Sequence, residues 1–548
     1  MSRKQKIIVS ITGIFLVLMI LVGLTYAYFL TKITGNTNTK SISVSTANLV
    51  LEYGENTNVV QGINNAEPGY SVEKIFTATN KGNSTVTYGA ALESIVNGLT
   101  RQEDLVYTLT CTSYLKEGFS LASNGTITGT VDGTCNGVST EKQFPSTSTL
   151  SLMTTNTIDT THTHAYKLTV TYKEMNVDQS TDMNKTFSAK VNIVDLNALT
   201  VNNPYKNDTG TLKKTIIDNA MLGIGSTQFG SEVTTFTSIS GENERVLNTA
   251  PDDYGTSYYY RGNVLDNYVT FADKTWRIVR INGDGTIRLV LDDVAKDSSG
   301  NVIKTAFNTY TNDNAYVGYM YGTPGSTTYD ATHENINDST IKTKVDKWYE
   351  DNLKTNYTNY LADTLFCNDK TLASDGIGGV KTQLGYGNNN KTYYAATERL
   401  QYSAGTTSIT TAKPTFKCAE NATNTYSRFT VDVATLSNGN QTNGDLKYPI
   451  GLLSADEVSY AGAYKYYQTN RSYYLYNSSI TSDLWLLSPY FCNLYRVGEW
   501  RVDGSNARIT FYYVHFDYAF RPSINLKASV LISGGDGTKE NPYTVKLS

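Results

Sequence analysis

The stretch with the greatest capacity for binding runs from Tyr490 to Tyr518 and reads YFCNLYRVGEWRVDGSNARITFYYVHFDY. Aromatic rings and an imidazole are interleaved there with arginine and aspartate. Tyr, Trp and Arg provide large, rigid contact areas at a low entropic cost, as in binding hot spots and paratopes. We therefore predict that a ligand contacts this segment. The predicted contact residues are Tyr490, Phe491, Cys492, Asn493, Leu494, Tyr495, Arg496, Arg501, Asp503, Ser505, Arg508, Thr510, Tyr512, Tyr513, His515, Phe516, Asp517 and Tyr518.

An alternative reading places this segment in the core of a tyrosine-rich protein. In a strand, residues 508–513 would alternate between two faces, so half of them would be buried whatever the function. The preceding run from Trp485 to Leu487 is continuously apolar, as a buried strand is, whereas the segment itself is mixed, as a partly exposed surface is. We assign a fixed scaffold to Trp276, Trp485, Pro489, Glu499, Trp500, Arg521 and Pro522, and we expect exposure at Tyr495, Arg501, Tyr512, His515 and Tyr518.

Motifs for catalysis are absent from the sequence. It contains no HExxH, no GxSxG, no P-loop and no GxGxxG after a strand. His162 and His164 are two residues apart, which in a strand places both on one face, as a metal site or simply as part of a solvated strand. We expect no catalytic residue, no metal and no cofactor.

Five cysteines occur in the chain. In an oxidising compartment Cys111 can pair with Cys135, and Cys367 with Cys418, each within its own domain. Closing such loops contributes about 3 to 4 kcal/mol each in the chain-entropy model. Cys492 is then left unpaired. Five free thiols are the alternative, because sequence alone does not determine connectivity.

Composition and charge limit the class of protein. The 548 residues suffice for two large or three smaller domains. Charged residues make up 18%, and 42 Tyr with many Asn, Thr, Ser and Gly supply the polar surface, which suits an extracellular β-rich protein. The net charge is -4 and basic runs are confined to the first six residues, so nucleic acid is excluded as a partner.

The N-terminus predicts export. Three basic residues precede an apolar run from Ile7 to Leu24, which ends in Thr25-Tyr26-Ala27. This pattern predicts a signal peptide or a transmembrane anchor over residues 1–30, because the run is long enough to span a bilayer. A buried core helix is the alternative. We expect the rest of the chain at the cell surface or outside the cell.

Residues 41–200 predict a β-sandwich, since short alternating runs such as Ser71 to Ala78 are separated by Gly, Asn and Ser turns. The first ninety residues resemble camelysin and the TasA-type biofilm fibre proteins in four features. These are a leader ending TYAYF, a strand near residue 41, the string EPG and the string KIFTATNKGNSTVTY. The resemblance covers about the first ninety residues. It implies a jelly-roll-like sandwich, a dedicated signal peptidase and fibre association, so a structural extracellular-matrix fibre protein is the alternative function.

Residues 201–252 predict a helix and a linker. Thr209 to Leu222 has a helical period, closed by Gly223, and Gly, Ser, Thr and Asn dominate afterwards. An irregular edge of the next domain is the alternative. Further on, Asn282 to Gly285 predicts a hairpin turn, Ser339 to Leu353 a helix, and Ser454 to Glu457 a capping box that opens a helix.

Several strings between residues 253 and 548 resemble the C-type-lectin-like domains of bacterial surface proteins, including the variable proteins of diversity-generating retroelements. They are YRGNVLDNYVTFADKTWRIVRINGDGTIRLVL, YPIGLLSADEVSYAGA, SDLWLLSP and FRPSINLKASVLISGGDGTKENPYTV. The resemblance implies an α+β lectin-like domain whose segment 490–518 is diversified. The implied partner is a protein or glycan on another cell, a phage or a host.

Two other activities of that fold fit less well. An oxidase with this fold converts cysteine to formylglycine, but its chemistry uses two nearby cysteines and Cys492 has no second one close in sequence. Calcium-dependent sugar binding uses EPN or QPD and WND strings, which are absent, although Glu499, Trp500 and Asp503 stand in a comparable loop. We therefore expect a mainly β protein with some α that binds a ligand and is not an enzyme.

Overall fold

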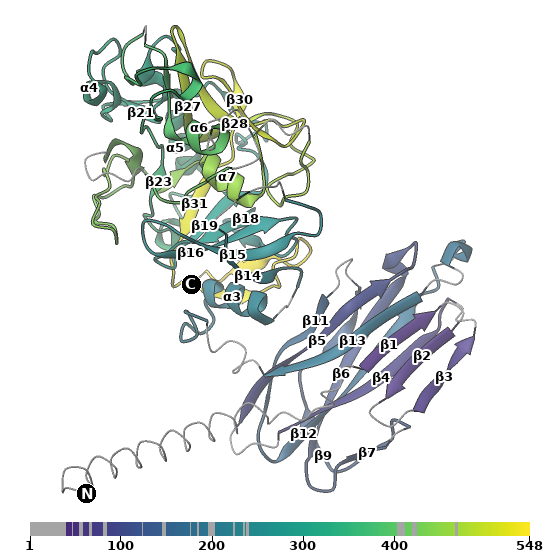
Figure 1. Cartoon of the computed structure of the whole chain (residues 1–548). Helices are drawn as coiled ribbons and strands as arrows, with labels where there is room; N and C mark the ends of the chain where they lie inside the picture. Colours follow the sequence, from purple (N-terminus) through teal and green to yellow (C-terminus); the bar gives the residue numbers. More distant parts are fainter. Residues whose placement is uncertain are drawn as a thin grey trace, which may run out of the picture. The chain divides into compact units, whose positions relative to one another are not determined.

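The computed structural model describes residues 40–547 apart from short gaps, the longest being 196–202, 403–411 and 419–424. The predicted leader, residues 1–30, lies outside the described residues. No helix among the described residues is long and apolar enough to cross a membrane. Two compact units are present, one containing residues up to 206 with 221–226, the other 207–220 with 227–548. The chain is mainly β with some α, as predicted (Figure 1).

The first unit consists of two antiparallel sheets with strand orders β11-β5-β13-β1-β2-β3 and β10-β6-β12-β4, and β9 also pairs with β6. The strands of the first sheet are β1 (Lys40–Ser45), β2 (Asn48–Tyr53), β3 (Asn58–Asn64), β5 (Val86–Asn97), β11 (Thr149–Ile158) and β13 (Thr186–Asp195). Those of the second are β4 (Ser71–Thr79), β6 (Leu105–Leu115), β9 (Val131–Thr134), β10 (Val138–Gln143) and β12 (His162–Tyr172). A small hairpin joins β7 (Ser120–Leu121) to β8 (Ile127–Thr128).

Both sheets contribute to one hydrophobic core, which is the arrangement of a sandwich. Alternate burial along β4 shows how this core forms. Val72, Phe76 and Ala78 are buried, whereas Ile75 and Thr77, on either side of Phe76, are half-buried. The Phe76 ring stacks on Tyr166 of β12 with centroids 4.9 Å apart. Residues spaced by two along each strand therefore fill the space between the sheets.

A group of hydrogen-bonded polar side chains lies within this core. The Tyr88 hydroxyl is 2.6 Å from the Tyr166 hydroxyl and 2.7 Å from Nδ1 of His164. Asn156 donates to the Tyr166 hydroxyl at 2.6 Å. Burial lowers the pKa of His164 to about 4, so its imidazole is neutral at physiological pH. His164 is therefore a satisfied core residue, and the interpretation of a solvated strand is wrong for it.

The second unit contains a ten-stranded sheet with the order β14-β15-β16-β18-β17-β33-β32, and β19 links β18 to β31, which also pairs with β26. Its strands are β14 (Gln228–Glu232), β15 (Arg245–Pro251), β16 (Thr256–Gly262), β17 (Tyr268–Phe271), β18 (Lys274–Ile281), β19 (Ile287–Leu291), β26 (Ile450–Gly451), β31 (Ser523–Leu526), β32 (Ile532–Gly534) and β33 (Tyr543–Val545). The predicted turn at Asn282 to Gly285 joins β18 to β19.

A six-stranded sheet of the same unit carries the predicted binding segment and has the order β20-β30-β27-β28-β29, with β24 beside β27. Its strands are β20 (Lys304–Thr305), β24 (Thr392–Tyr393), β27 (Leu484–Asn493), β28 (Arg496–Val502), β29 (Ile509–Tyr513) and β30 (Tyr518–Ala519). Two short ribbons pair β21 (Met320–Tyr321) with β22 (Asn337–Asp338), and β23 (Phe366–Cys367) with β25 (Arg428–Phe429).

Helices of the second unit are α3 (Leu212–Leu222), α4 (Tyr329–His333), α5 (Thr340–Asn352), α6 (Ala395–Gln401) and α7 (Ala455–Ala461). The predicted helix from Ser339 is α5, with Ser339 as its N-cap and its apolar face buried. The predicted capping box at the start of α7 is confirmed, since Ser454 accepts from Glu457 N–H and the Glu457 carboxylate accepts from Ser454 N–H.

The segment from 201 to 252 is not a linker along its whole length. Its helix is α3, but α3 packs on the second unit, where Asn219 donates to the Tyr543 hydroxyl at 2.8 Å. The region rich in small polar residues contains β14 and β15, which extend the ten-stranded sheet. A composition rich in Gly, Ser and Thr suggested a flexible connection, whereas the main-chain hydrogen bonds of the sheet order it.

The structure joins Cys111 to Cys135 and Cys367 to Cys418, as predicted, and leaves Cys492 free and buried. Burial raises the pKa of the Cys492 thiol to about 12, so the thiol stays protonated and unreactive. The thiol contributes by packing rather than by chemistry.

The second disulfide gives the first prediction. Cys418→Ser opens a loop whose ends are 51 residues apart, and the chain-entropy model gives a loss of about 4 kcal/mol. We expect a clearly lower melting temperature for the second unit in scanning calorimetry. Cys492→Ala, which removes one buried sulfur and no cross-link, is the control and should cost less. Equal losses would contradict a stabilising role for the bridge.

A histidine held between two carboxylates gives the second prediction. His162 Nε2 is 2.7 Å from Asp132 and its Nδ1 is 2.7 Å from Asp159. The hydrogen bonds with these carboxylates raise the pKa of His162 above its usual 6.5 in the folded protein. The pairing therefore stabilises the fold fully below pH 6.5, the pKa of the unfolded chain, and this stabilisation is lost as the pH rises through the higher pKa of the folded protein. The melting temperature of the first unit should therefore fall as the pH rises above about 6.5. His162→Gln should remove this part of the fall, and an unchanged pH profile would refute the assignment.

Candidate functional site

Three strands and two turns build the predicted binding segment. β27 turns into β28 through Leu494 and Tyr495, and β28 pairs with β29 so that Gly498 lies opposite Tyr513. The first turn and the residues after β29 therefore lie at the same end of the sheet. The loop from residue 503 to 508, which joins β28 to β29, lies at the opposite end.

Part of the segment belongs to the interior, as the alternative reading expected for half of it. Five of the predicted contact residues are buried, which removes them from any exposed surface and corrects the prediction for Tyr490, Phe491, Cys492, Asp503 and Thr510. The residues assigned to the scaffold are also buried, namely Trp276, Trp485, Pro489, Glu499, Trp500, Arg521 and Pro522. Sequence alone missed the burial of the five because the segment mixes apolar and polar residues, so its pattern does not show which face of the strands is covered.

A buried lysine explains why these aromatic residues point inward. Lys465 Nζ lies 4.0 Å from the ring centroid of Tyr490, 5.0 Å from that of Trp500 and 5.1 Å from that of Phe511. Nζ also hydrogen-bonds to the Tyr490 hydroxyl and to Gln401. Burial lowers the pKa of Lys465 to about 6. The inner face of the sheet is therefore an aromatic cage around one amine.

Asp503 lies in a self-contained turn at the far end of β28. It accepts hydrogen bonds from the main chain and hydroxyl of Ser505 and from Asn506, and Arg508 lies 3.3 Å away. Burial raises the pKa of Asp503, but the bonds from Ser505 and Asn506 outweigh it and lower the pKa to about 2. This carboxylate is already satisfied, so we do not assign Asp503, Ser505 or Arg508 to the surface described next.

The remaining residues extend from the other end of the sheet along β29 towards Arg501 and Tyr518, which lie near the start of β27 because Trp485 is opposite Arg501 and Leu484 opposite Ala519. Tyr512 packs on Phe516 with centroids 4.6 Å apart and on Tyr518 at 5.7 Å. The Arg501 guanidinium lies 5.4 Å from the Tyr512 centroid and 5.2 Å from that of Tyr518. Arg496 lies 5.1 Å from the Tyr513 centroid. Of the predicted residues here, Asn493, Leu494, Tyr495, Arg496, His515, Phe516 and Asp517 are exposed, and Arg501, Tyr512, Tyr513 and Tyr518 are half-buried.

A residue from a distant part of the sequence joins this end. Val497 N–H donates to the Thr311 carbonyl at 2.9 Å, which brings the chain next to Tyr310 against the start of β28. Tyr310 is 61% exposed and also packs on Tyr316 at 5.5 Å. No motif in the sequence marks Tyr310. The term aromatic surface is used below for Tyr310, Leu494, Tyr495, Arg496, Tyr512, Tyr513, His515, Phe516 and Tyr518.

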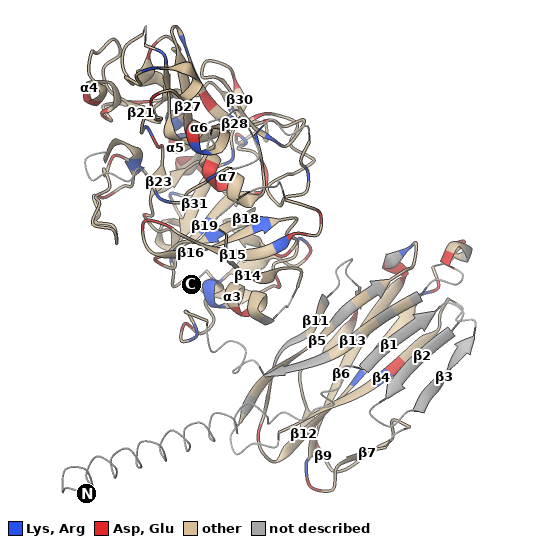
Figure 2. Cartoon of the chain, in the orientation of Figure 1, with Lys and Arg blue, Asp and Glu red and all other residues tan. Residues whose placement is uncertain are grey.

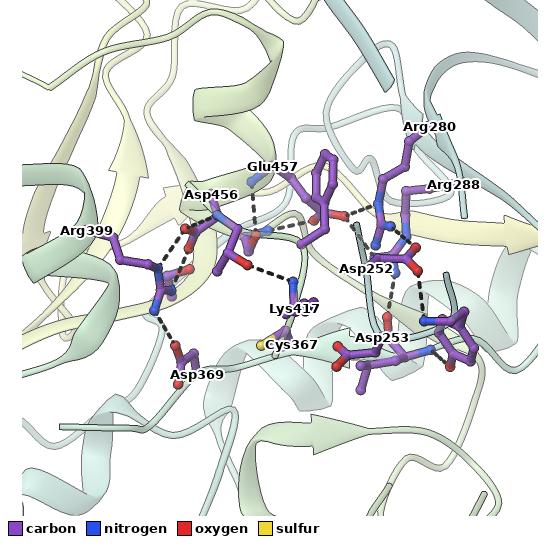
Figure 3. Close-up of a pocket in the computed structure, with 16 residues that line it drawn as sticks. Asp252, Asp253, Arg280, Arg288, Cys367, Asp369, Arg399, Lys417, Asp456 and Glu457 are labelled. Atoms are coloured by element: carbon purple, nitrogen blue, oxygen red, sulfur yellow. Dashed lines mark hydrogen bonds and ion pairs between the residues drawn. The ribbon is translucent and has the colours of Figure 1, made fainter. Parts of the chain in front are cut away.

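A charged pocket elsewhere in the second unit is the other candidate site (Figure 3). Arg399 binds Asp456 through two hydrogen bonds of 2.9 and 3.0 Å and Asp369 through one of 2.8 Å. Arg280 binds Asp252 at 2.7 Å and approaches Glu457 at 3.4 Å. Figure 2 shows the same meeting of charges, with basic residues on β18 and β19 near the acidic residues of α7.

The three arginines of this pocket are already paired with its carboxylates. Arg288 lies 3.7 Å from Glu457, so one carboxylate serves both this arginine and Arg280. Asp253 accepts from Cys418 N–H at 2.8 Å and from Asn438 at 2.9 Å, and burial raises its pKa. Buried charges that are paired in this way hold loops together. We therefore assign the pocket a structural role.

No arrangement of free metal ligands is present in the part of the chain that the structure describes. Among the described residues, the one group of His, Cys, Asp and Glu with the spacing of a metal site is Cys111, Cys135 and His164. Both sulfurs of that group form a disulfide, and the imidazole bonds to Tyr88. Cys492 has no second cysteine beside it, since the other four are paired.

The division between cage and surface gives the third prediction. Trp500→Ala should lower the free energy of unfolding of the second unit by about 3 to 5 kcal/mol, because it empties a fully buried site. Tyr495→Ala should change it by less than about 0.5 kcal/mol, because that side chain is 64% exposed. Urea denaturation measures both changes. Comparable losses would show that the turn belongs to the core.

The predicted binding segment thus presents exposed aromatic rings, while its buried rings surround the amine of Lys465. No protein-family model matches the chain, and no curated protein matches it.

Proposed function

We propose that this chain is a cell-surface ligand-binding or adhesion protein and that the aromatic surface is its binding site. One observation carries the proposal. Among the described residues, the large hydrophobic side chains that are exposed include three aromatic ones, Tyr310, Tyr495 and Phe516, and all three belong to this surface. Exposed aromatic side chains are costly in water, so their concentration in one place favours an interaction site.

The chemistry of the surface suits recognition of a protein or a glycan. Tyrosine offers both an apolar ring face and a hydroxyl group. Its side chain has few rotatable bonds, so it loses little conformational entropy on binding. Arg496 and His515 are exposed beside the rings and can donate hydrogen bonds to carbonyl, hydroxyl or carboxylate groups. The partner in this proposal is a protein or glycan on another cell, a phage or a host. Export and membrane attachment through residues 7–24 are part of the same proposal.

Separation of surface from core also supports diversification of the segment. The exposed turn residues Asn493 to Arg496 and His515 to Asp517 contribute little to the cage around Lys465. Replacing them therefore leaves the packing of Tyr490, Trp500 and Phe511 intact. A surface that varies without unfolding its support is what a diversified binding protein requires. The lectin-like fold proposed for residues 253–548 would supply that support.

The fourth prediction tests binding directly. The full chain displayed on cells is probed with a glycan array and with intact bacterial and animal cells. Tyr495→Ala, Phe516→Ala and Tyr310→Ala should weaken binding to any probe that the unaltered chain captures, and a central ring should cost about 2 kcal/mol or more. Val433→Ala, at a side chain 65% exposed outside the aromatic surface, is the matched control and should bind normally.

Two results would overturn the proposal. Binding that survives all three alanine variants places the site elsewhere, and a loss shared with Val433→Ala points to a general effect on display. Sequencing the gene in sibling strains provides a second arm. Variation confined to the exposed turns, with Tyr490, Trp500 and Phe511 constant, would support diversification, whereas variation spread evenly along the chain would refute it.

A further inference from the structure

A buried lysine, an asparagine and an aspartate are in contact in the second unit. Lys370 follows β23 and is fully buried. Its Nζ lies 2.7 Å from Oδ1 of Asn335, which follows α4. Nδ2 of the same asparagine donates to Oδ2 of Asp445 at 2.8 Å. These three residues belong neither to the aromatic surface nor to the lining of the charged pocket.

The surroundings of Lys370 orient its amine. Nζ is 2.7 Å from the Met320 carbonyl and 3.0 Å from the His333 carbonyl, and the Phe429 ring centroid lies 5.4 Å away. An ammonium would donate to both carbonyls and to Asn335. A neutral amine has two N–H groups, which the two carbonyls can accept, and its third position then lies beside the carboxamide oxygen of Asn335, one bond from Cγ.

The neutral form is accessible at this site. Burial lowers the pKa of Lys370 to about 7, although the negative charges of Asp445 and Glu499 oppose the shift. A large share of the chains therefore carries a free amine at neutral pH. A nucleophile held against an electrophilic carbon by fixed neighbours reacts far faster than the same groups in solution.

We propose that Lys370 and Asn335 join in an intramolecular isopeptide bond. The lone pair of Nζ attacks Cγ of Asn335, a new C–N bond forms, and the bond from Cγ to Nδ2 breaks. A proton of Nζ passes through the Asp445 carboxylate to the departing nitrogen, which leaves as ammonia. The reaction exchanges one amide for another, so it needs no oxidant or reductant.

Asp445 is the catalytic acid and base of this step because it already contacts the leaving nitrogen. Asn335 and Asp445 are half-buried, so ammonia has a route to solvent while Nζ remains enclosed. The product links the end of α4 to the residue three positions after Cys367. It would thus add a second covalent tie to the region already closed by Cys367 and Cys418 and would restrict the unfolded chain further.

Peptide mass spectrometry of the purified, reduced full chain is the fifth prediction and the test of this proposal. Trypsin should yield a branched peptide that joins residues 305–342 to residues 355–381, uncleaved at Lys370, with the summed mass lower by one ammonia. Fragmentation should locate the link at Asn335 and Lys370. Loss of ammonia at an Asn-Gly pair such as Asn438-Gly439 also lowers the mass, but it produces no branched peptide.

Three variants separate the chemistry from the fold. Lys370→Met and Asn335→Ala should abolish the branched peptide. Asp445→Asn should lower its yield at least tenfold in chains that still form the Cys367 to Cys418 disulfide and melt cooperatively. Asp363→Asn, the same change at another aspartate of the unit, should retain the link. Unlinked peptides from the unaltered chain would overturn the proposal, and full linkage in Asp445→Asn would overturn the role of Asp445.

Discussion

A basic side chain removed from water needs acceptors or aromatic faces, and the second unit is organised around that requirement. Arg280, Arg288 and Arg399 are bound to the carboxylates of the charged pocket, Lys370 to two carbonyls, and Lys465 to a cage of rings. Each of these basic side chains ties together segments that are far apart in sequence. The desolvation cost is offset only when every partner is in place, so these contacts fix one arrangement of the loops.

The predicted binding segment illustrates how this requirement divides a sequence between interior and surface. Tyr490, Trp500 and Phe511 are separated along the chain but meet at Lys465. Because their rings are committed to the amine, the side chains that remain for a ligand are those of the two turns and the end of β29. The same strands therefore hold both fully buried and exposed side chains of the predicted binding segment.

Local patterns were sufficient to predict much of the fold. The capping box at Ser454, the turn at Asn282 and the helix from Ser339 depend on residues close in sequence, and all three are present. The strands β14 and β15 were missed because small polar residues surround them, although β15 pairs with its sequence neighbour β16. Within the site, the burial of Thr510 and the contribution of Tyr310 were missed for another reason, since both depend on which segments meet in space.

The chain enters the second unit next to the last strands of its ten-stranded sheet. Leu212 N–H donates to the Val530 carbonyl at 3.0 Å, and Ile532 N–H to the Gly210 carbonyl at 3.2 Å, so the chain enters this unit beside its final strands. α3 and the C-terminus lie at one end of the unit, and β27, β28 and β30 at the other (Figure 1). A module whose entry and exit coincide can be moved between host proteins as a cassette, because the gap that it leaves is short.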